Sequence, residues 1–197
     1  EIKEKYFTII ENESDHLLML TNKVLTLSKL ENHKLEMAKS TFELQPMMAD
    51  LKEKFTTKAT KPVHITINLQ ADTAYADDEF IKEAISNLLD NSIKYSGESV
   101  NIDISSQVTD KYTLIKVRDN GIGISEKDMK TIFDKFERAS ASLRTKSGGT
   151  TGFGLGLNYV MNVTRSHGGY VSVESQEGKY SEFTISLPVS TTEETTV

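Results

Sequence analysis

The 197-residue chain contains no cysteine. This absence excludes a disulfide framework and a metal site built on thiolates. No apolar run is long enough to span a bilayer, and the remaining composition is typical of a globular protein. The chain also starts at Glu1, without a methionine or a signal peptide. We therefore expect a piece of a longer protein, with room for one core of ordinary size and an appended element.

Clusters of basic residues are absent as well, and the net charge is −6. The aromatic residues are not interleaved with lysine and arginine as they are on a base-stacking platform. These features exclude a nucleic-acid binder. We likewise expect no membrane contact by this chain.

The segment before Pro46 has neither proline nor glycine, and residues 1 to about 37 are predicted to form one long helix. Two interleaved seven-residue series run along it: Ile10, Leu17, Val24 and Glu13, Leu20, Leu27. Such series form the seam of a coiled coil or helical bundle, with Glu13 as a charged exception. The seam predicts a partner, either a neighbouring helix or a second copy of the chain. The alternative is a helix that folds back onto the following domain.

After about residue 41 the sequence changes to short alternating segments. Strands are predicted at 42–44, 64–69, 100–104, 113–117, 170–173 and 182–187, and helices at 46–57, 78–95 and 154–166. Strands with one apolar face predict a mostly antiparallel sheet with helices on one side only. The fold class is therefore α/β, a two-layer sandwich over residues 41–190 with a flexible tail at 191–197.

The helix predicted at 78–95 carries unusual polar residues. A mostly apolar stripe runs along it: Ile81, Ile85, Leu88 and Ser92. Asn87, Asn91, Lys94 and Tyr95 lie along one side of the helix, beside this stripe. Asparagine is a poor helix former, so two of them in register indicate a specific role. The alternative is that they are solvated surface residues or hydrogen-bonding core residues.

A first glycine cluster follows the strand at 113–117. Asp119 precedes Gly121, Gly123 and Ile124. Asp-Asn-Gly alone would predict a hairpin turn, but the apolar residues here are atypical of one. Glycines separated by one residue let backbone approach a flat ligand, and an aspartate can accept a hydrogen bond from an exocyclic amine.

A second glycine cluster leads into the helix predicted at 154–166. It comprises Gly152, Phe153, Gly154, Leu155, Gly156 and Leu157. A glycine-rich loop before a helix presents free N–H groups and a positive dipole end, which suit phosphates. The spacing matches neither the P-loop nor the dinucleotide fingerprint, and a flexible linker is the alternative.

Between the two clusters lies a pair of phenylalanines flanked by charge. Phe133 and Phe136 are expected to anchor the adjoining loop to the core. Lys135 and Arg138 can reach phosphate, or they are solvated charges at the end of a helix.

These motifs, taken in order, resemble the ATP-binding catalytic domain of sensor histidine kinases, in the GHKL superfamily. The N box corresponds to residues 87–96, the first glycine box to 119–123, the F box to 132–136 and the second glycine box to 152–157. The helix up to Glu31 resembles the second helix of the dimerisation and histidine-phosphotransfer hairpin. By this resemblance residues 1–40 are part of that hairpin, 137–151 form an ATP lid and 41–190 form a Bergerat-type catalytic domain.

The resemblance also implies roles. Asn91 would coordinate Mg²⁺ that bridges the ATP phosphates, with Asn87 nearby, while Lys94 would contact phosphate and Tyr95 would pack on the nucleotide. Asp119 would bind the adenine amino group, and the two glycine boxes with Ile124 would line the nucleotide. Asn87, Lys94 and Arg138 are the candidates for a catalytic role. The cofactors implied are ATP and Mg²⁺.

One departure from the family concerns histidine. The phosphoacceptor of the family is followed by an acidic residue and soon by proline, and none of His16, His33, His64 and His167 has that context. We therefore expect the chain to bind ATP without phosphorylating a histidine of its own. The longer protein is expected to be a homodimeric membrane sensor with this part in the cytoplasm, and its partner a response regulator receiver domain.

Two alternatives remain. Hydrolytic relatives such as gyrase and the heat-shock chaperone carry a glutamate at the position of Asn87, where it activates water. An amide cannot act as a base, so slow net ATP hydrolysis is expected here. The other alternative is a non-enzymatic helical scaffold.

Overall fold

The computed structural model describes residues 2–32, 35–135 and 154–190. The chain divides into two compact units, Glu1–Glu36 and Met37–Val197. The first unit consists of helix α1 (Ile2–Glu31). Large apolar side chains of α1 are more than half exposed: Tyr6, Phe7, Ile10, Leu17, Leu18 and Leu25. Ile10 and Leu17 of the predicted seam are among them, whereas Leu27 of the seam is 2% exposed. The partner of the seam stays a prediction.

The helix is shorter than the prediction of about 37 residues, because it ends at Glu31. Asn32 follows it, and its side-chain Nδ2 donates a hydrogen bond of 2.7 Å to the carbonyl of Ser28. Asparagine competes for the helix backbone in this way and disfavours another turn. Residues 35–39 contain no helix or strand.

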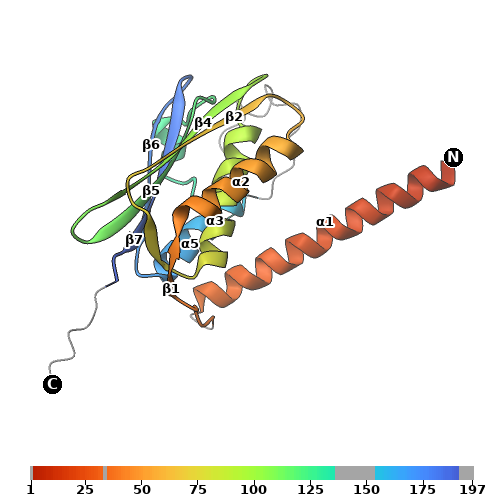
Figure 1. The fold of residues 1–197 in the computed structure, drawn as a ribbon. Helices are drawn as coiled ribbons and strands as arrows, with labels where there is room; N and C mark the ends of the chain where they lie inside the picture. Colours follow the sequence, from red (N-terminus) through yellow and green to blue (C-terminus); the bar gives the residue numbers. More distant parts are fainter. Residues whose placement is uncertain (1, 33–34, 136–153, 191–197) are drawn as a thin grey trace. The chain divides into compact units, whose positions relative to one another are not determined.

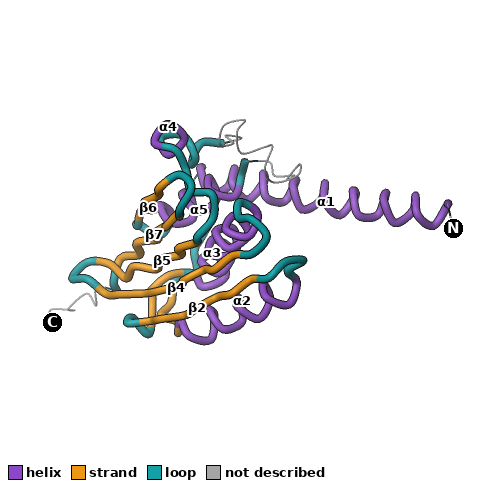
Figure 2. The backbone as a smooth tube through the Cα atoms, turned by 90° about the horizontal axis from the view of Figure 1, so that it is seen from above, coloured by secondary structure: helices purple, strands orange, loops and turns teal. Residues whose placement is uncertain are grey.

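The second unit contains a five-stranded sheet in the order β2, β4, β5, β7, β6 (Figure 2). The strands are β2 (Val63–Leu69), β4 (Val100–Val108), β5 (Tyr112–Asp119), β6 (Tyr170–Gln176) and β7 (Tyr180–Pro188). Strands β2 and β4 are parallel, and the other pairs are antiparallel. The sheet is therefore mixed and mostly antiparallel, as predicted.

Three helices cover one face of this sheet (Figure 1): α2 (Leu44–Lys58), α3 (Asp78–Lys94) and α5 (Gly156–Ser166). Side chains of β4 alternate accordingly, with Ile102 buried and Asn101 and Asp103 exposed. The other face, which we call the open face, is not covered by any helix in this part of the structure. The predicted two-layer sandwich is thus confirmed.

Two small elements are missing from the sequence prediction. Strand β3 (Thr73–Ala76) pairs only with β1 (Ser40–Glu43), and α4 (Glu126–Met129) is a single turn. Four residues are too few for a hydrophobic period to be visible, so pairing and capping define them. In α4, the Ser125 hydroxyl accepts a hydrogen bond from the backbone N–H of Asp128.

Two helix starts also differ from the prediction. Helix α2 begins at Leu44, so Pro46 lies within the first turn, where the missing N–H has no helical partner. Helix α5 begins at Gly156 rather than at 154, because Gly154 has a left-handed backbone with φ of 68°.

Helix α3 is the central element on the covered face. Its predicted stripe is buried, with Ile81, Ile85 and Leu88 fully so. Burying a side chain of this size stabilises the fold by roughly 1.5–3 kcal/mol. Packing of this stripe therefore places the polar side of α3 next to α5 and the end of β5.

Candidate nucleotide-binding site

Asn87 occupies the middle of α3 and is only 6% exposed. Its side-chain Nδ2 donates to the carbonyl of Glu83 at 2.8 Å, a bond that a structural core asparagine would also make. The carbonyl oxygen Oδ1 faces the start of α5, since a Cβ built on Gly156 would lie 3.2 Å from it. A glycine at 156 therefore lets the α5 backbone approach this amide closely.

Asn91 and Lys94 lie in the last turn of α3, and Tyr95 caps the helix. All three are partly exposed. The carbonyl of Asn91 accepts the N–H of Tyr95 at 2.8 Å. The Lys94 ammonium lies 5.5 Å from the centroid of the Tyr95 ring. This end of the helix thus offers an amide, a cation and an aromatic ring together.

Lys61 holds the turn that follows, a role that no sequence pattern predicts. Its ammonium donates to the carbonyl and hydroxyl of Ser96 at 3.1 and 2.9 Å and to the carbonyl of Gly97 at 2.9 Å. Burial lowers the pKa of Lys61. A cation at the C-terminal end of α3 also suits the negative end of the helix dipole.

Asp119 ends β5 and is 6% exposed. One carboxylate oxygen accepts the Ser92 hydroxyl at 2.9 Å, and the other accepts the N–H of Gly121 at 2.8 Å. Burial raises the pKa of Asp119, while the hydrogen bonds from Gly121, Ser92 and the backbone of Ser181 lower it. These three donors orient a buried carboxylate, whose two oxygens have about four lone pairs in all and can therefore accept from a ligand as well. Ser92 counted only as part of the apolar stripe in the sequence prediction.

The first glycine cluster packs its backbone against α3 and β6. The N–H of Ile122 donates to the carbonyl of Tyr95 at 3.0 Å. A Cβ on Gly121 would lie 2.6 Å from that same carbonyl. Gly123 has φ of +66°, and a Cβ there would lie 2.1 Å from the carbonyl of Gln176. Side chains at these two positions would displace the segment.

The segment continues into α4 instead of returning as a strand, so the hairpin alternative is wrong. The N–H of Ile124 donates to the Ser175 hydroxyl of β6 at 2.8 Å. This bond fixes the cluster beside the sheet edge.

The second glycine cluster is described from Gly154 onward. Leu155 is buried, and Gly156 and Leu157 begin α5. Among the described residues, no side chain caps the first N–H groups of α5. Gly152, Phe153 and Arg138 lie outside the described residues, as do Phe136 and the predicted lid at 137–151.

Phe133, from the predicted F box, packs edge-on against Phe183 of the sheet, with ring centroids 6.3 Å apart. Its carbonyl accepts the side-chain amide of Asn158 in α5 at 2.9 Å. These contacts attach the segment before residue 136 to both the core and α5. Lys135 is exposed.

The fold therefore brings three separate stretches together. Contacts join Ser92 to Asp119, Tyr95 to Gly121, and Asn87 to Gly156. Polar residues of α3, the end of β5 and the start of α5 form one connected site on the covered side of the sheet.

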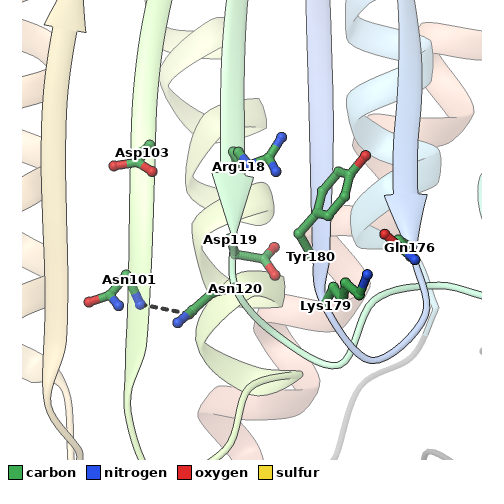
Figure 3. A pocket seen from close by; sticks show the side chains of 8 residues that line it. All are labelled: Asn101, Asp103, Arg118, Asp119, Asn120, Gln176, Lys179 and Tyr180. Carbon is green, nitrogen blue, oxygen red and sulfur yellow. Dashed lines mark hydrogen bonds between the residues drawn. The ribbon is translucent and has the colours of Figure 1, made fainter.

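A hollow of about 510 Å³ lies elsewhere, on the open face (Figure 3). It is lined by Asn101, Asp103, Arg118, Asp119, Asn120, Gln176, Lys179 and Tyr180. Asp119, the one predicted site residue in this set, directs its carboxylate to Ser92 of α3. The Arg118 guanidinium lies over the Tyr180 ring at 3.9 Å and pairs with Glu182 at 3.2 Å. The hollow thus shares Asp119 with the site between the helices, while its other lining residues belong to none of the predicted motifs except Asn120.

The described residues contain no group of three or more histidines, aspartates or glutamates placed to hold a metal ion. None of the helices described here has the length and apolar character needed to cross a membrane.

Comparison with known proteins identifies the family. Residues 76–191, well over half of the chain, match the family described as "Histidine kinase-, DNA gyrase B-, and HSP90-like ATPase". The chain belongs to this family. The matched range contains all of the predicted site residues. The resemblance drawn from the four motifs is thereby confirmed.

Individual relatives in this family are sensor kinases. The chain is 30% identical to "Sensor histidine kinase WalK" of Bacillus subtilis over 192 residues, which are 95% of this chain and 31% of that protein. It spans less than half the length of the other curated relatives that it matches most strongly.

Two solved structures show the same fold. The "Acinetobacter baumannii histidine kinase AdeS" is 24% identical with a TM-score of 0.77, covering 94% of this chain and 84% of that one. Full-length ShkA, in complex with AMPPNP, is 22% identical with a TM-score of 0.82, covering 97% of this chain and 40% of that one.

Proposed function

We propose that the chain is the ATP-binding catalytic core of a sensor histidine kinase. It would transfer the γ-phosphoryl group of ATP to a histidine on an upstream helix, for relay to an aspartate of a response regulator. The observation that carries the proposal is the convergence of Asp119, the α3 asparagines and the start of α5 in one site. Membership of an ATPase family and the named kinase relatives support it.

The adenine end of the site is the buried carboxylate of Asp119. Its Ser92 and Gly121 donors leave it able to accept a further hydrogen bond, as the exocyclic amine of adenine would require. Only glycine fits at residue 121, because a Cβ there would lie 2.6 Å from the carbonyl oxygen of Tyr95 and 2.8 Å from Oδ1 of Asp119. Tyr95 would pack on the nucleotide at the same end.

The phosphate end comprises Asn87, Asn91, Lys94 and the start of α5. Amide oxygens are hard ligands that suit Mg²⁺, and the partly exposed Asn91 is the residue that would hold it. When bound, Mg²⁺ neutralises charge on the phosphates. The uncapped N–H groups of α5 and the Lys94 ammonium would bind phosphate oxygens. Arg138 is proposed to reach the transferred group.

In this mechanism the chain positions ATP and stabilises charge, which is most of what phosphoryl transfer requires. Asn87 would orient the phosphate chain through Oδ1, because its amide nitrogen is bonded to the carbonyl of Glu83. Since an amide cannot accept a proton from water, hydrolysis by this residue is disfavoured. A kinase is thus favoured over a hydrolytic clamp.

The histidines described in the second unit do not suit the role of phosphoacceptor. His167 is buried, with Nε2 accepting the N–H of Asp77 at 3.0 Å and Nδ1 2.8 Å from the carbonyl of Val163. Burial lowers the pKa of His167. His64 is exposed on β2, outside the site. The acceptor is therefore proposed to lie on another helix, which would pair with the apolar seam of α1 in a homodimer.

The test is phosphotransfer to a separately supplied helical hairpin that carries a histidine followed by an acidic residue and proline. With γ-labelled ATP and Mg²⁺, we expect an acid-labile phosphate on the hairpin and little free phosphate. An acid-stable phosphate on serine, or rapid net hydrolysis without transfer, would contradict the proposal.

We further propose that the longer protein is a membrane-anchored sensor with this part in the cytoplasm. The names of two relatives support the sensor kinase part of this proposal.

A further inference from the structure

Helices α3 and α5 are joined by a hydrogen bond between two side chains that the proposed mechanism does not use. The hydroxyl of Tyr159 donates to Oε2 of Glu83 at 2.7 Å. Tyr159 is 1% exposed, one of the most deeply buried large side chains among the described residues, whereas Glu83 is exposed, so the bond is part-buried. The two helices run next to each other on the covered face of the sheet (Figures 1 and 2).

The position of this bond within the two helices is informative. Glu83 lies one turn before Asn87, and its backbone carbonyl accepts the Asn87 amide at 2.8 Å. Tyr159 lies one turn after the start of α5, where Gly156 approaches Oδ1 of Asn87. The Tyr159–Glu83 bond is therefore one helical turn from the contact between Asn87 and Gly156.

The chemistry of the pair makes it a durable connection. A phenol that donates to a carboxylate forms a charge-assisted bond, stronger than a bond between neutral groups. Burial, together with the Glu83 carboxylate, raises the pKa of Tyr159, so its proton stays in place at physiological pH.

We propose that Glu83 and Tyr159 are positioning residues that set the spacing between Asn87 and the N-terminal end of α5 for the phosphate chain of ATP. The inference rests on the proposed function and deepens it. Neither residue need touch the nucleotide. The adenine end is held independently, because Asp119 is oriented by Ser92 and Gly121. Loss of the pair should consequently weaken binding of phosphates and spare binding of adenosine.

The experiment measures affinities of Mg-ATP and of adenosine by calorimetry for the full chain. Variants are Tyr159→Phe, Glu83→Ala and the double variant. The matched control is Tyr180→Phe, since Tyr180 donates to Glu174 at the same distance of 2.7 Å, but on the open face. Thermal unfolding is recorded for each protein, so that loss of fold is separated from loss of affinity.

We expect Tyr159→Phe to weaken Mg-ATP binding about tenfold and adenosine binding less than twofold, with the control unchanged. The double variant should lose no more than the larger single loss, because the two residues act as one unit. Equal losses for both ligands would overturn the inference and leave a purely structural bond. Unchanged Mg-ATP affinity would also overturn it. If the unmodified chain bound no Mg-ATP, the proposed function itself would fail.

Discussion

The two faces of the sheet each carry a tyrosine that donates to a glutamate at 2.7 Å, yet the surroundings of the two pairs differ. Tyr159 and Glu83 join two helices on the covered face, with the phenol buried. Tyr180 and Glu174 join neighbouring strands on the open face, where Glu174 is exposed and Tyr180 is partly exposed. Both glutamates are exposed, so the difference lies in the phenol. A donor that water can reach loses little when its bond breaks, whereas a phenol buried between helices would be left without a partner.

The same contrast holds for the charged groups. On the covered side, the carboxylate of Asp119 is buried and its pKa is raised by that burial. On the open face, Glu182 pairs with Lys116 at 3.4 Å and with Arg118 at 3.2 Å, and both cations remain partly exposed. Exposed pairs of this kind contribute about 0–1 kcal/mol each. Function is therefore expected to depend on the covered side.

The largest effect is predicted for Asp119→Asn, compared with Asp103→Asn on the open face. The amide cannot present two acceptor oxygens, so we expect Mg-ATP affinity to fall at least about a hundredfold. Asp103 is exposed on the adjacent strand, and its replacement should leave affinity unchanged. Calorimetry checks both variants, with circular dichroism to verify the fold. Equal losses in the two variants would erase the distinction between the faces.

A smaller effect, dependent on pH, is predicted for Ser92→Ala. The Ser92 hydroxyl lowers the pKa of Asp119 against the larger raising effect of burial, so its removal should raise that pKa further. Adenine binding requires the ionised carboxylate. The affinity for Mg-ATP should thus be about tenfold lower near neutral pH. As pH falls, the affinity of the variant should begin to decline at a higher pH than that of the unmodified chain.

The same rise in the pKa of Asp119 that weakens adenine binding should add to the stability of the folded state at low pH. Because the folded pKa of Asp119 lies above its usual value of 3.8, the proton favours the folded state. This contribution is complete below that value and disappears as pH rises through the folded pKa. Urea unfolding of Ser92→Ala between pH 3.8 and the folded pKa of Asp119 should show a larger contribution than in the unmodified chain. The exposed Ser172→Ala should show the same contribution as the unmodified chain. A pH profile identical in all three proteins would refute the role of Ser92.

The smallest effect is predicted for Glu182→Gln on the open face. Removing the shared partner of Lys116 and Arg118 should lower the free energy of unfolding by no more than about 1 kcal/mol at low salt. The difference should shrink at high salt, since exposed charges are screened. Denaturant unfolding at two ionic strengths measures it. A loss above about 2 kcal/mol, or a loss of Mg-ATP affinity, would show that the open face matters more than its exposure indicates.

Much of the site was predictable because its chemistry is local in sequence. The stripe of Ile81, Ile85 and Leu88 predicted which side of α3 is buried, and the glycines predicted close backbone approach near Asp119. The end of α1 was missed because the helical period of the sequence does not show that the side chain of Asn32 bonds to the Ser28 carbonyl. Strand β3 was missed because its partner β1 lies some thirty residues earlier.

Other features depend on residues distant in sequence that meet only in the fold. Lys61 reaches Ser96 across 35 residues, Ser92 reaches Asp119 across 27, and Tyr159 reaches Glu83 across 76. No local period or motif encodes such pairings.

The sequence by itself determined the family, the order of the four motifs and the two-layer class, because residue type and spacing dictate helix faces, strand faces and tight turns. Only the tertiary structure decided how the motifs meet. Burial of α3 against the sheet brings Asn87 to Gly156 and Ser92 to Asp119, and places the hollow beside Arg118 on the opposite face. Hydrophobic packing sets those distances, and it acts between residues that the linear sequence keeps far apart.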